Sequence, residues 1–231
     1  MSTRYAKFWS SFGFVIILLT GSLTSASEPV DWTGFYAGAF GSYLAGHVTS
    51  NDPAHEESTG DYDDDSPMLG IQGGYHKQFD NGWVAGFEII LPLYIQNGTA
   101  VDKVWFPDSV TYEANYRYAA FVGVKAGRPH GKALPYAFGA VGIANVDGKT
   151  YNVDLDENYS EGFEQSAVAT HLVFQLGGGV DYQVNDKMFA GLRVGAFFGG
   201  KADHTMPWNE PGPNEFGFNA LLVQISGGYR F

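Results

Sequence analysis

The last eleven residues, 221–231 (LLVQISGGYRF), constrain the fold more than any other segment of the chain. One face of this segment reads Phe231, Tyr229, Gly227, Ile225, Val223 and Leu221, which is the period-two pattern of a β-strand. In a soluble domain the apolar face and the edge of such a strand would both stay exposed. A membrane barrel closes the sheet and turns the apolar face to lipid. The segment therefore predicts one strand of a transmembrane β-barrel.

The N-terminal segment has the layout of a secretory signal peptide. Arg4 and Lys7 form a positive region, residues 8–23 carry no charge, and residues 24–27 (TSAS) are small. The apolar centre, residues 12–19, is too short to span a bilayer as a helix. We expect residues 1–27 to be a signal peptide, cleaved after Ala26 or Ser27, and residues 28–231 to form one barrel domain in the outer membrane.

Composition excludes several classes of function. The chain has no cysteine, which excludes thiol catalysis, thiolate metal sites and disulfide scaffolds. Its formal net charge of −12 makes it a poor candidate for binding nucleic acid.

Alternating segments separated by short and long connections run along the whole chain. They predict an all-β fold, an eight-stranded antiparallel up-and-down barrel, with strands near 33–48, 67–79, 83–95, 114–127, 134–146, 167–183, 187–198 and 217–231. The short connections, 80–82, 128–133 and 184–187, contain turn-forming Asn, Gly, Pro and Asp. Outer-membrane barrels have this asymmetry, with short periplasmic turns and longer extracellular loops.

Acidic residues are concentrated in the four long connections, 49–66, 96–113, 147–166 and 199–216. These segments contain 19 of the 25 Asp and Glu residues but only three lysines. The sequence therefore predicts a barrel whose extracellular loops are acidic.

The alternation of polar and apolar residues along the strands predicts which face of the sheet is in contact with water. Charged residues on the strands are few, of both signs, and lie opposite apolar residues. A soluble barrel would need many more surface charges, so we expect the polar faces to line a narrow lumen. There Glu88 and Asp181 should pair with basic residues of the same set: Arg117, Lys125, Arg193 and Arg230. Two strands are less regular: the phase of 134–146 is ambiguous, and Pro92 fits its strand only at a bulge or above the membrane.

Aromatic residues gather near the predicted periplasmic ends of the strands, as in an interfacial girdle. The set is Trp32, Phe35, Tyr75, Phe79, Trp83, Tyr136, Tyr182, Phe189, Tyr229 and Phe231.

Several motifs together resemble a known family. They are 31–38 (DWTGFYAG), 70–75 (GIQGGY), 82–88 (GWVAGFE), 134–136 (LPY), 177–182 (GGGVDY) and 228–231 (GYRF). The chain resembles the small outer-membrane barrels of alphaproteobacteria, which include porin-family proteins, surface antigens and hemin-binding proteins. The resemblance covers nearly the whole mature chain, but residues 123 and 125 (Gly and Lys) depart from the paired basic residues usual there.

The resemblance has consequences for partners and cofactors. It implies contact with outer-membrane lipid and lipopolysaccharide, and a C-terminal signal, carried by Tyr229 and Phe231, that the barrel-assembly machinery reads. Since some members bind haem, His47, His55 and His204, which we expect on the outside loops, are candidate haem contacts. No cofactor or metal is otherwise implied: the acidic runs 61–65 and 152–156 lack the Gly and Glu that an EF-hand requires at later positions.

These observations favour a non-enzymatic surface or structural protein of the outer membrane. The alternative is a narrow porin or a haem-binding receptor. An outer-membrane hydrolase would need a catalytic group, and nothing in the sequence places Ser226 near His171. Lumen radius, loop ligand and oligomeric state are not encoded in any pattern of the sequence.

Overall fold

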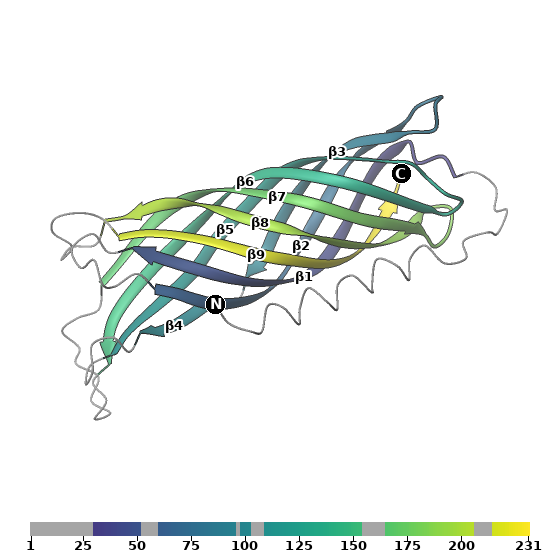
Figure 1. Cartoon of the computed structure of the whole chain (residues 1–231). Coiled ribbons are helices and arrows are strands. Elements are labelled where there is room, and N and C mark those ends of the chain that lie inside the picture. Colours follow the sequence, from purple (N-terminus) through teal and green to yellow (C-terminus); the bar gives the residue numbers. More distant parts are fainter. Residues whose placement is uncertain (1–29, 52–59, 96–97, 103–108, 154–164, 206–213) are drawn as a thin grey trace, which may run out of the picture.

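The computed structural model describes residues 30–51, 60–95, 98–102, 109–153, 165–205 and 214–231 (Figure 1). The predicted signal peptide lies outside the described residues. The described chain forms β1 (Gly34–Asn51), β2 (Gly60–Gln78), β3 (Val84–Ile95), β4 (Gly98–Asp102), β5 (Ser109–Gly127), β6 (Ala133–Val153), β7 (Gln165–Gln183), β8 (Met188–His204) and β9 (Asn214–Arg230). In this part of the chain, no helix is both long enough and apolar enough to cross a membrane.

The strands close into a barrel. Neighbours pair antiparallel in the order β3-β2-β1-β9-β8-β7-β6-β5, and β5 pairs back with β3. The short β4 follows β3 and pairs with the same neighbour, β5, so the two segments together occupy one strand position. The prediction of an eight-stranded antiparallel barrel is confirmed.

The three short connections are the predicted ones. Phe79 N donates to Trp83 O at 2.8 Å, His130 N to Ala133 O at 2.7 Å, and Val184 N to Met188 O at 2.9 Å. Gly82, with φ +81°, adopts a left-handed conformation that side chains with a Cβ disfavour. These turns place one end of every strand at a common rim.

At the opposite end the strands are longer than predicted. β1 and β2 remain paired up to Ser50 and Gly60, and β5 and β6 up to Ser109 and Val153. These stretches are polar, and the alternating pattern fades there. Backbone ladders need no apolar side chains, so strands that have left the lipid can continue without the pattern that predicts them.

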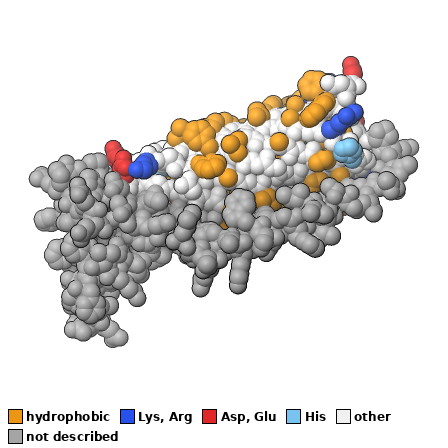
Figure 2. Space-filling model, viewed as in Figure 1, with side chains coloured by type: hydrophobic (Ala, Val, Ile, Leu, Met, Phe, Trp, Pro, Cys, Tyr) orange, Lys and Arg blue, Asp and Glu red, His pale blue; other side chains and the backbone are white. Residues whose placement is uncertain are grey.

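Apolar side chains cover the outside of the wall and polar ones point inward. On β3, Phe87 and Ile89 are about half exposed, whereas Glu88 between them is 1% exposed. Figure 2 shows hydrophobic side chains along the visible wall and charged side chains toward its two ends. The predicted orientation of the faces is therefore correct.

The position of an aromatic residue along the barrel axis does not determine whether its ring faces outward or into the interior. Phe35, Phe79, Trp83, Tyr182, Tyr229 and Phe231 are exposed near the turn end, as a girdle requires, but Trp32, Tyr136 and Phe189 are buried. The ambiguous β6 explains one of these errors, because Leu134, Tyr136 and Phe138 all face the interior. The girdle prediction is therefore wrong for three of its ten members.

Pro92 lies at a β-bulge. Leu69 pairs with Tyr94, but the next residue, Gly70, pairs with Pro92, so Leu93 has no partner on β2. A bulge accommodates a residue that lacks an N–H donor, which agrees with the first of the two predicted placements.

Candidate functional site: the polar interior of the barrel

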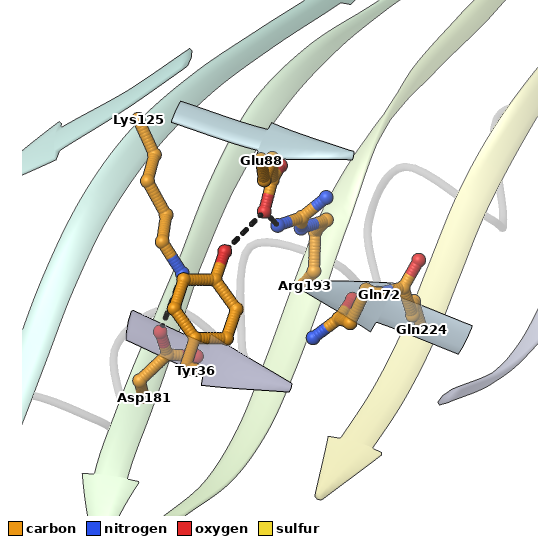
Figure 3. Close-up of polar contacts among 7 residues, drawn as sticks. All are labelled: Tyr36, Gln72, Glu88, Lys125, Asp181, Arg193 and Gln224. Carbon is orange, nitrogen blue, oxygen red and sulfur yellow. Dashed lines mark hydrogen bonds and ion pairs between the residues drawn. The ribbon is translucent and has the colours of Figure 1, made fainter. Parts of the chain in front are cut away.

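A buried ion pair spans the barrel at its centre. Arg193 Nη2 on β8 donates to Glu88 Oε2 on β3 at 2.8 Å, and both side chains are almost completely buried (Figure 3). Four steps around the ring separate β3 from β8 in either direction, so the pair joins opposite walls. The Tyr36 hydroxyl donates to the same carboxylate oxygen at 3.2 Å.

A second buried ion pair lies beside the first. Lys125 Nζ on β5 donates to Asp181 Oδ2 on β7 at 2.9 Å. The ammonium also lies 4.8 Å from the ring centres of Tyr36 and of Tyr136, and the guanidinium of Arg193 lies 4.2 Å from that of Phe138. Aromatic faces stabilise cations best where water is excluded. We call Tyr36, Glu88, Lys125, Asp181 and Arg193 the central network.

A hydrogen bond between two glutamine side chains extends the polar interior beyond the central network. Gln224 Nε2 on β9 donates to Gln72 Oε1 on β2 at 3.0 Å (Figure 3), and β1 lies between these two strands in the sheet. His76, also on β2, stacks on Tyr36 with ring centres 4.5 Å apart. The polar interior therefore draws side chains from seven strands.

Two glycines lie against the acidic members of the network. A Cβ on Gly191 would lie 2.6 Å from Asp181 Oδ1, and a Cβ on Gly123 would lie 2.9 Å from the Cβ of Ala140 and 3.4 Å from Glu88 Cγ. Gly123 is one of the departures from the resembled family, and its missing side chain allows the close approach of Ala140 on β6.

An aromatic layer fills the interior on the loop side of the central network. Phe121 and Phe197 have ring centres 5.8 Å apart, Phe197 and Phe218 are 5.7 Å apart, and Tyr116 meets Phe218 edge-on at 6.2 Å. We call Tyr116, Phe121, Phe197 and Phe218 the aromatic layer. With the central network, it occupies the lumen over much of its height.

Arg117 is not part of the lumen network, contrary to the prediction. The register between β5 and β6 shifts between Tyr116 and Tyr118, leaving Arg117 as the bulged residue. Tyr116 then faces the interior and Arg117 is exposed. The bulge inverts the alternation that assigned Arg117 to the inside.

Arg230 lies at the turn end, away from the two ion pairs. Its Nη1 donates to Asp31 O at 2.6 Å, its Nη2 to Asp186 O at 3.1 Å, and its guanidinium lies over the Trp32 ring at 5.2 Å. Beside it, the Thr33 N–H donates to Asp31 Oδ1 at 2.9 Å and holds the pKa of that carboxyl below its ordinary value. Trp32 and Arg230 together cover the turn end of the interior.

The C-terminal aromatics lie where the sequence analysis placed them. Phe231 is 80% exposed, its N–H donates to Phe35 O at 3.0 Å, and its ring meets Tyr229 edge-on at 5.3 Å. A hydrogen bond with Tyr229 raises the pKa of Lys187 in the adjacent turn. This geometry is compatible with an interfacial anchor and leaves the role in assembly a prediction.

Of the three histidines predicted on outside loops, His204 is misplaced. It is the last residue of β8, its side chain is fully buried, and its Nε2 lies 3.1 Å from Nε2 of His171. His55 and the side chain of His47 lie outside the described residues. Among the described residues, no group of three or more His, Asp or Glu side chains could hold a metal ion.

The comparison with protein families identifies the family of the chain. The family model described as outer membrane protein beta-barrel domain matches residues 14–231. The chain belongs to this outer-membrane β-barrel family. Its location is the outer membrane, as predicted. None of the curated proteins matches the chain.

Among the solved structures similar to this outer-membrane barrel, OprG supports the fold. OprG of Pseudomonas aeruginosa has 15% sequence identity and a TM-score of 0.50, and the match covers 89% of this chain and 99% of that one. The Escherichia coli outer membrane protease OmpT has 6% identity and a TM-score of 0.49, with 92% and 100% covered. Ail of Yersinia pestis has 12% identity and a TM-score of 0.38, with 86% and 99% covered. At these identities the likeness concerns the fold alone.

Sequence reasoning did not identify several residues of the interior. Tyr36, Gln72 and Gln224 all lie on inward phases of strands that it had placed correctly, so their polar atoms were the available signal. The contact between His171 and His204 had no such signal, since it depends on where β7 and β8 stop pairing.

Proposed function

We propose that this chain is a non-enzymatic surface and structural protein of the outer membrane, and that its own side chains seal its barrel. The observation that carries the proposal is the Glu88–Arg193 ion pair, which joins opposite walls at 2.8 Å. The second ion pair and the aromatic layer fill the lumen beside and above it. Solutes have no passage past these groups unless buried charges separate, which costs several kcal/mol for each ion left unpaired.

The paired state of the central network also supports a non-enzymatic role. A catalytic acid or base must lie within hydrogen-bond reach of its substrate. Glu88, Asp181, Lys125 and Arg193 instead bind one another inside the wall. The acidic extracellular loops would then be the surface that the cell presents.

Conductance and liposome swelling test the proposal against the narrow-porin alternative. The full-length protein, refolded in liposomes, should give no steady conductance and no swelling with small sugars. Steady solute passage by the unmodified protein would overturn the sealed lumen and favour the porin.

A pair of double variants identifies which contacts seal the lumen. Glu88→Ala with Arg193→Ala should increase leakage, because it removes the connection between opposite walls. The matched control is Lys201→Ala with Glu215→Ala, which removes an ion pair of similar length (2.9 Å) that is solvent exposed. It should leave permeability unchanged, and equal leakage from both variants would show that the central pair has no sealing role.

A further inference from the structure

The wall between β7 and β8 is incomplete toward the loop end. The ladder between them ends at Val173 and Gly199, although β7 begins at Gln165 and β8 continues to His204. Beyond this point β7 remains paired with β6, and β8 with β9 after a register shift between Gly199 and Ala202. Two adjacent strands (Figure 1) therefore continue side by side without backbone pairing between them.

His171 and His204 connect the two strands in this region. His171 on β7 places its Nδ1 2.9 Å from Gly200 O on β8, and His204 on β8 places its Nδ1 2.8 Å from Ala167 O on β7. The two Nε2 atoms lie 3.1 Å apart between these contacts. We call this pair the histidine clasp, since its three contacts lie where ladder bonds are missing.

The hydrogen count of the clasp requires an additional proton. A backbone carbonyl only accepts hydrogen bonds, so both Nδ1 atoms must carry a hydrogen. Two neutral rings would then present unprotonated Nε2 atoms to each other, and two lone pairs do not form a hydrogen bond. All three contacts form together only when one Nε2 is also protonated, which gives the pair a single positive charge.

The ring orientation favours a proton over a metal ion between the two nitrogens. The ring centres are 5.3 Å apart and the Nε2 atoms 3.1 Å apart; the difference of 2.2 Å is about twice the distance from an imidazole centre to its nitrogen. The rings therefore meet end-on, as in a linear N–H···N bond. Zinc sites in proteins have three or four protein ligands, and among the described residues no group of three or more His, Asp or Glu side chains could supply them here.

The surroundings exclude water from the clasp. Both side chains are 1% exposed or less, Phe218 packs against His171 at 5.2 Å, and Phe216 meets His204 edge-on at 4.9 Å. Gly148 on β6 allows the close approach of His204, since a Cβ there would lie 3.0 Å from its Nδ1.

Charged groups surround the clasp on the neighbouring strands. Burial lowers the pKa of His204, while its contact with Ala167 O and the carboxylates of Asp147 on β6 and Asp203 on β8 act in the opposite direction. Lys149 on β6 lies opposite Glu113 on β5 in the register, and Lys201 on β8 pairs with Glu215 on β9. Negative charge thus acts on a pair that is itself positive once it holds its proton.

We propose that His171 and His204 form a binding site for one proton, which closes the wall between β7 and β8 at the loop end. With the proton bound, all three contacts form and the strands are held together. As pH rises through the titration of the pair, at least one contact is lost and the strands are free to separate. The occupant of the site is a proton, and the result is a pH-dependent seam in the barrel wall.

Hydrogen exchange in the full-length protein in lipid vesicles tests the proposal. At low pH within the folded range, the backbone amides of 165–172 that pair with β6 and those of 202–204 that pair with β9 should be protected, because the closed seam keeps both strands from fraying. After correction for intrinsic rates, their exchange should accelerate on the order of tenfold to hundredfold as the proton leaves, the range expected for losing a hydrogen bond to a charged group. In His204→Gln the exchange should be fast throughout and independent of pH. The matched control His130→Gln, in an exposed turn at the other end, should keep the pH dependence.

A spectroscopic measurement keeps the test independent of variant folding. Nitrogen-15 NMR of histidine-labelled protein should show one proton shared between two Nε2 atoms at low pH, and its loss at the pH where exchange accelerates. The proposal is overturned if both rings are singly protonated at every pH at which the barrel is folded. It is equally overturned if pH-dependent protection persists in His204→Gln.

Discussion

The central network and the histidine clasp are both buried and polar, but the backbone pairing of the barrel wall differs around them. Around the central network each strand pairs with both neighbours, so the ion pairs are additional to a complete ladder. At the clasp, the backbones of β7 and β8 no longer pair. In this part of the described chain, the side chains of His171 and His204 form the hydrogen bonds that connect the two strands. Polar burial thus has two uses in one barrel: filling a complete wall, and closing an incomplete one.

Removing one partner of the central pair should have the largest effect. Arg193→Ala leaves Glu88 buried without its cation, so we expect a loss of about 3–5 kcal/mol in the free energy of unfolding. Urea titration of the refolded protein in lipid vesicles measures it. The double variant Glu88→Leu with Arg193→Leu should recover most of the loss, because neither partner is left as an unpaired buried charge. A single variant as stable as the parent would show that the pair is not desolvated.

The aromatic layer should come next. Phe218→Ala removes a ring that contacts Tyr116, Phe197 and His171, so we expect a loss of about 3 kcal/mol or somewhat more. The same urea titration applies. Phe198→Ala, on the outward face of β8, is the control and should cost less, since lipid already surrounds its ring. Equal losses would mean that the layer is not packed like a protein core.

Phe231→Asp should separate stability from assembly. Charge at the interface costs only about 0–1 kcal/mol, too little to unfold the barrel. If the terminus is an assembly signal, outer-membrane abundance in cells should fall strongly while refolding yield in detergent stays near normal. Phe35→Asp, on an exposed neighbouring side chain at the same end, is the control. Normal abundance of the Phe231 variant would contradict the assembly role.

Arg117→Ala should have the smallest effect, within about 0.5 kcal/mol, because the side chain is exposed at a bulge. The comparison with Arg193→Ala is direct, since alternation alone assigned both residues to the lumen. A loss as large as that of Arg193→Ala would return Arg117 to the interior and contradict the bulge.

Alternation was sufficient wherever the ladder is regular. It placed Glu88, Lys125, Asp181 and Arg193 inside, although it could not say which acid meets which base, because that depends on the positions of strands around the ring. It failed for Arg117 because one bulge shifts the phase of every residue beyond it. It failed for His204 because strands outside lipid lack the pattern that defines their length.

The aromatic residues show a second limit. Composition indicated correctly that the turn end is rich in rings, but Trp32, Tyr136 and Phe189 fill the interior there. A narrow barrel must pack its lumen as well as anchor its rim, and the same residue types serve both purposes. Only the register distinguishes them.

The Glu88–Arg193 pair also bears on the order of folding. Its residues are 105 positions apart in the sequence and on opposite sides of the ring, so no hairpin or pair of adjacent strands can form it. A sheet that has curled only part of the way would hold both charges unpaired at its apolar midpoint, where each is costly. We therefore expect the stabilisation to arrive late, when the first and last strands meet, and a contact this distant in sequence should favour slow folding.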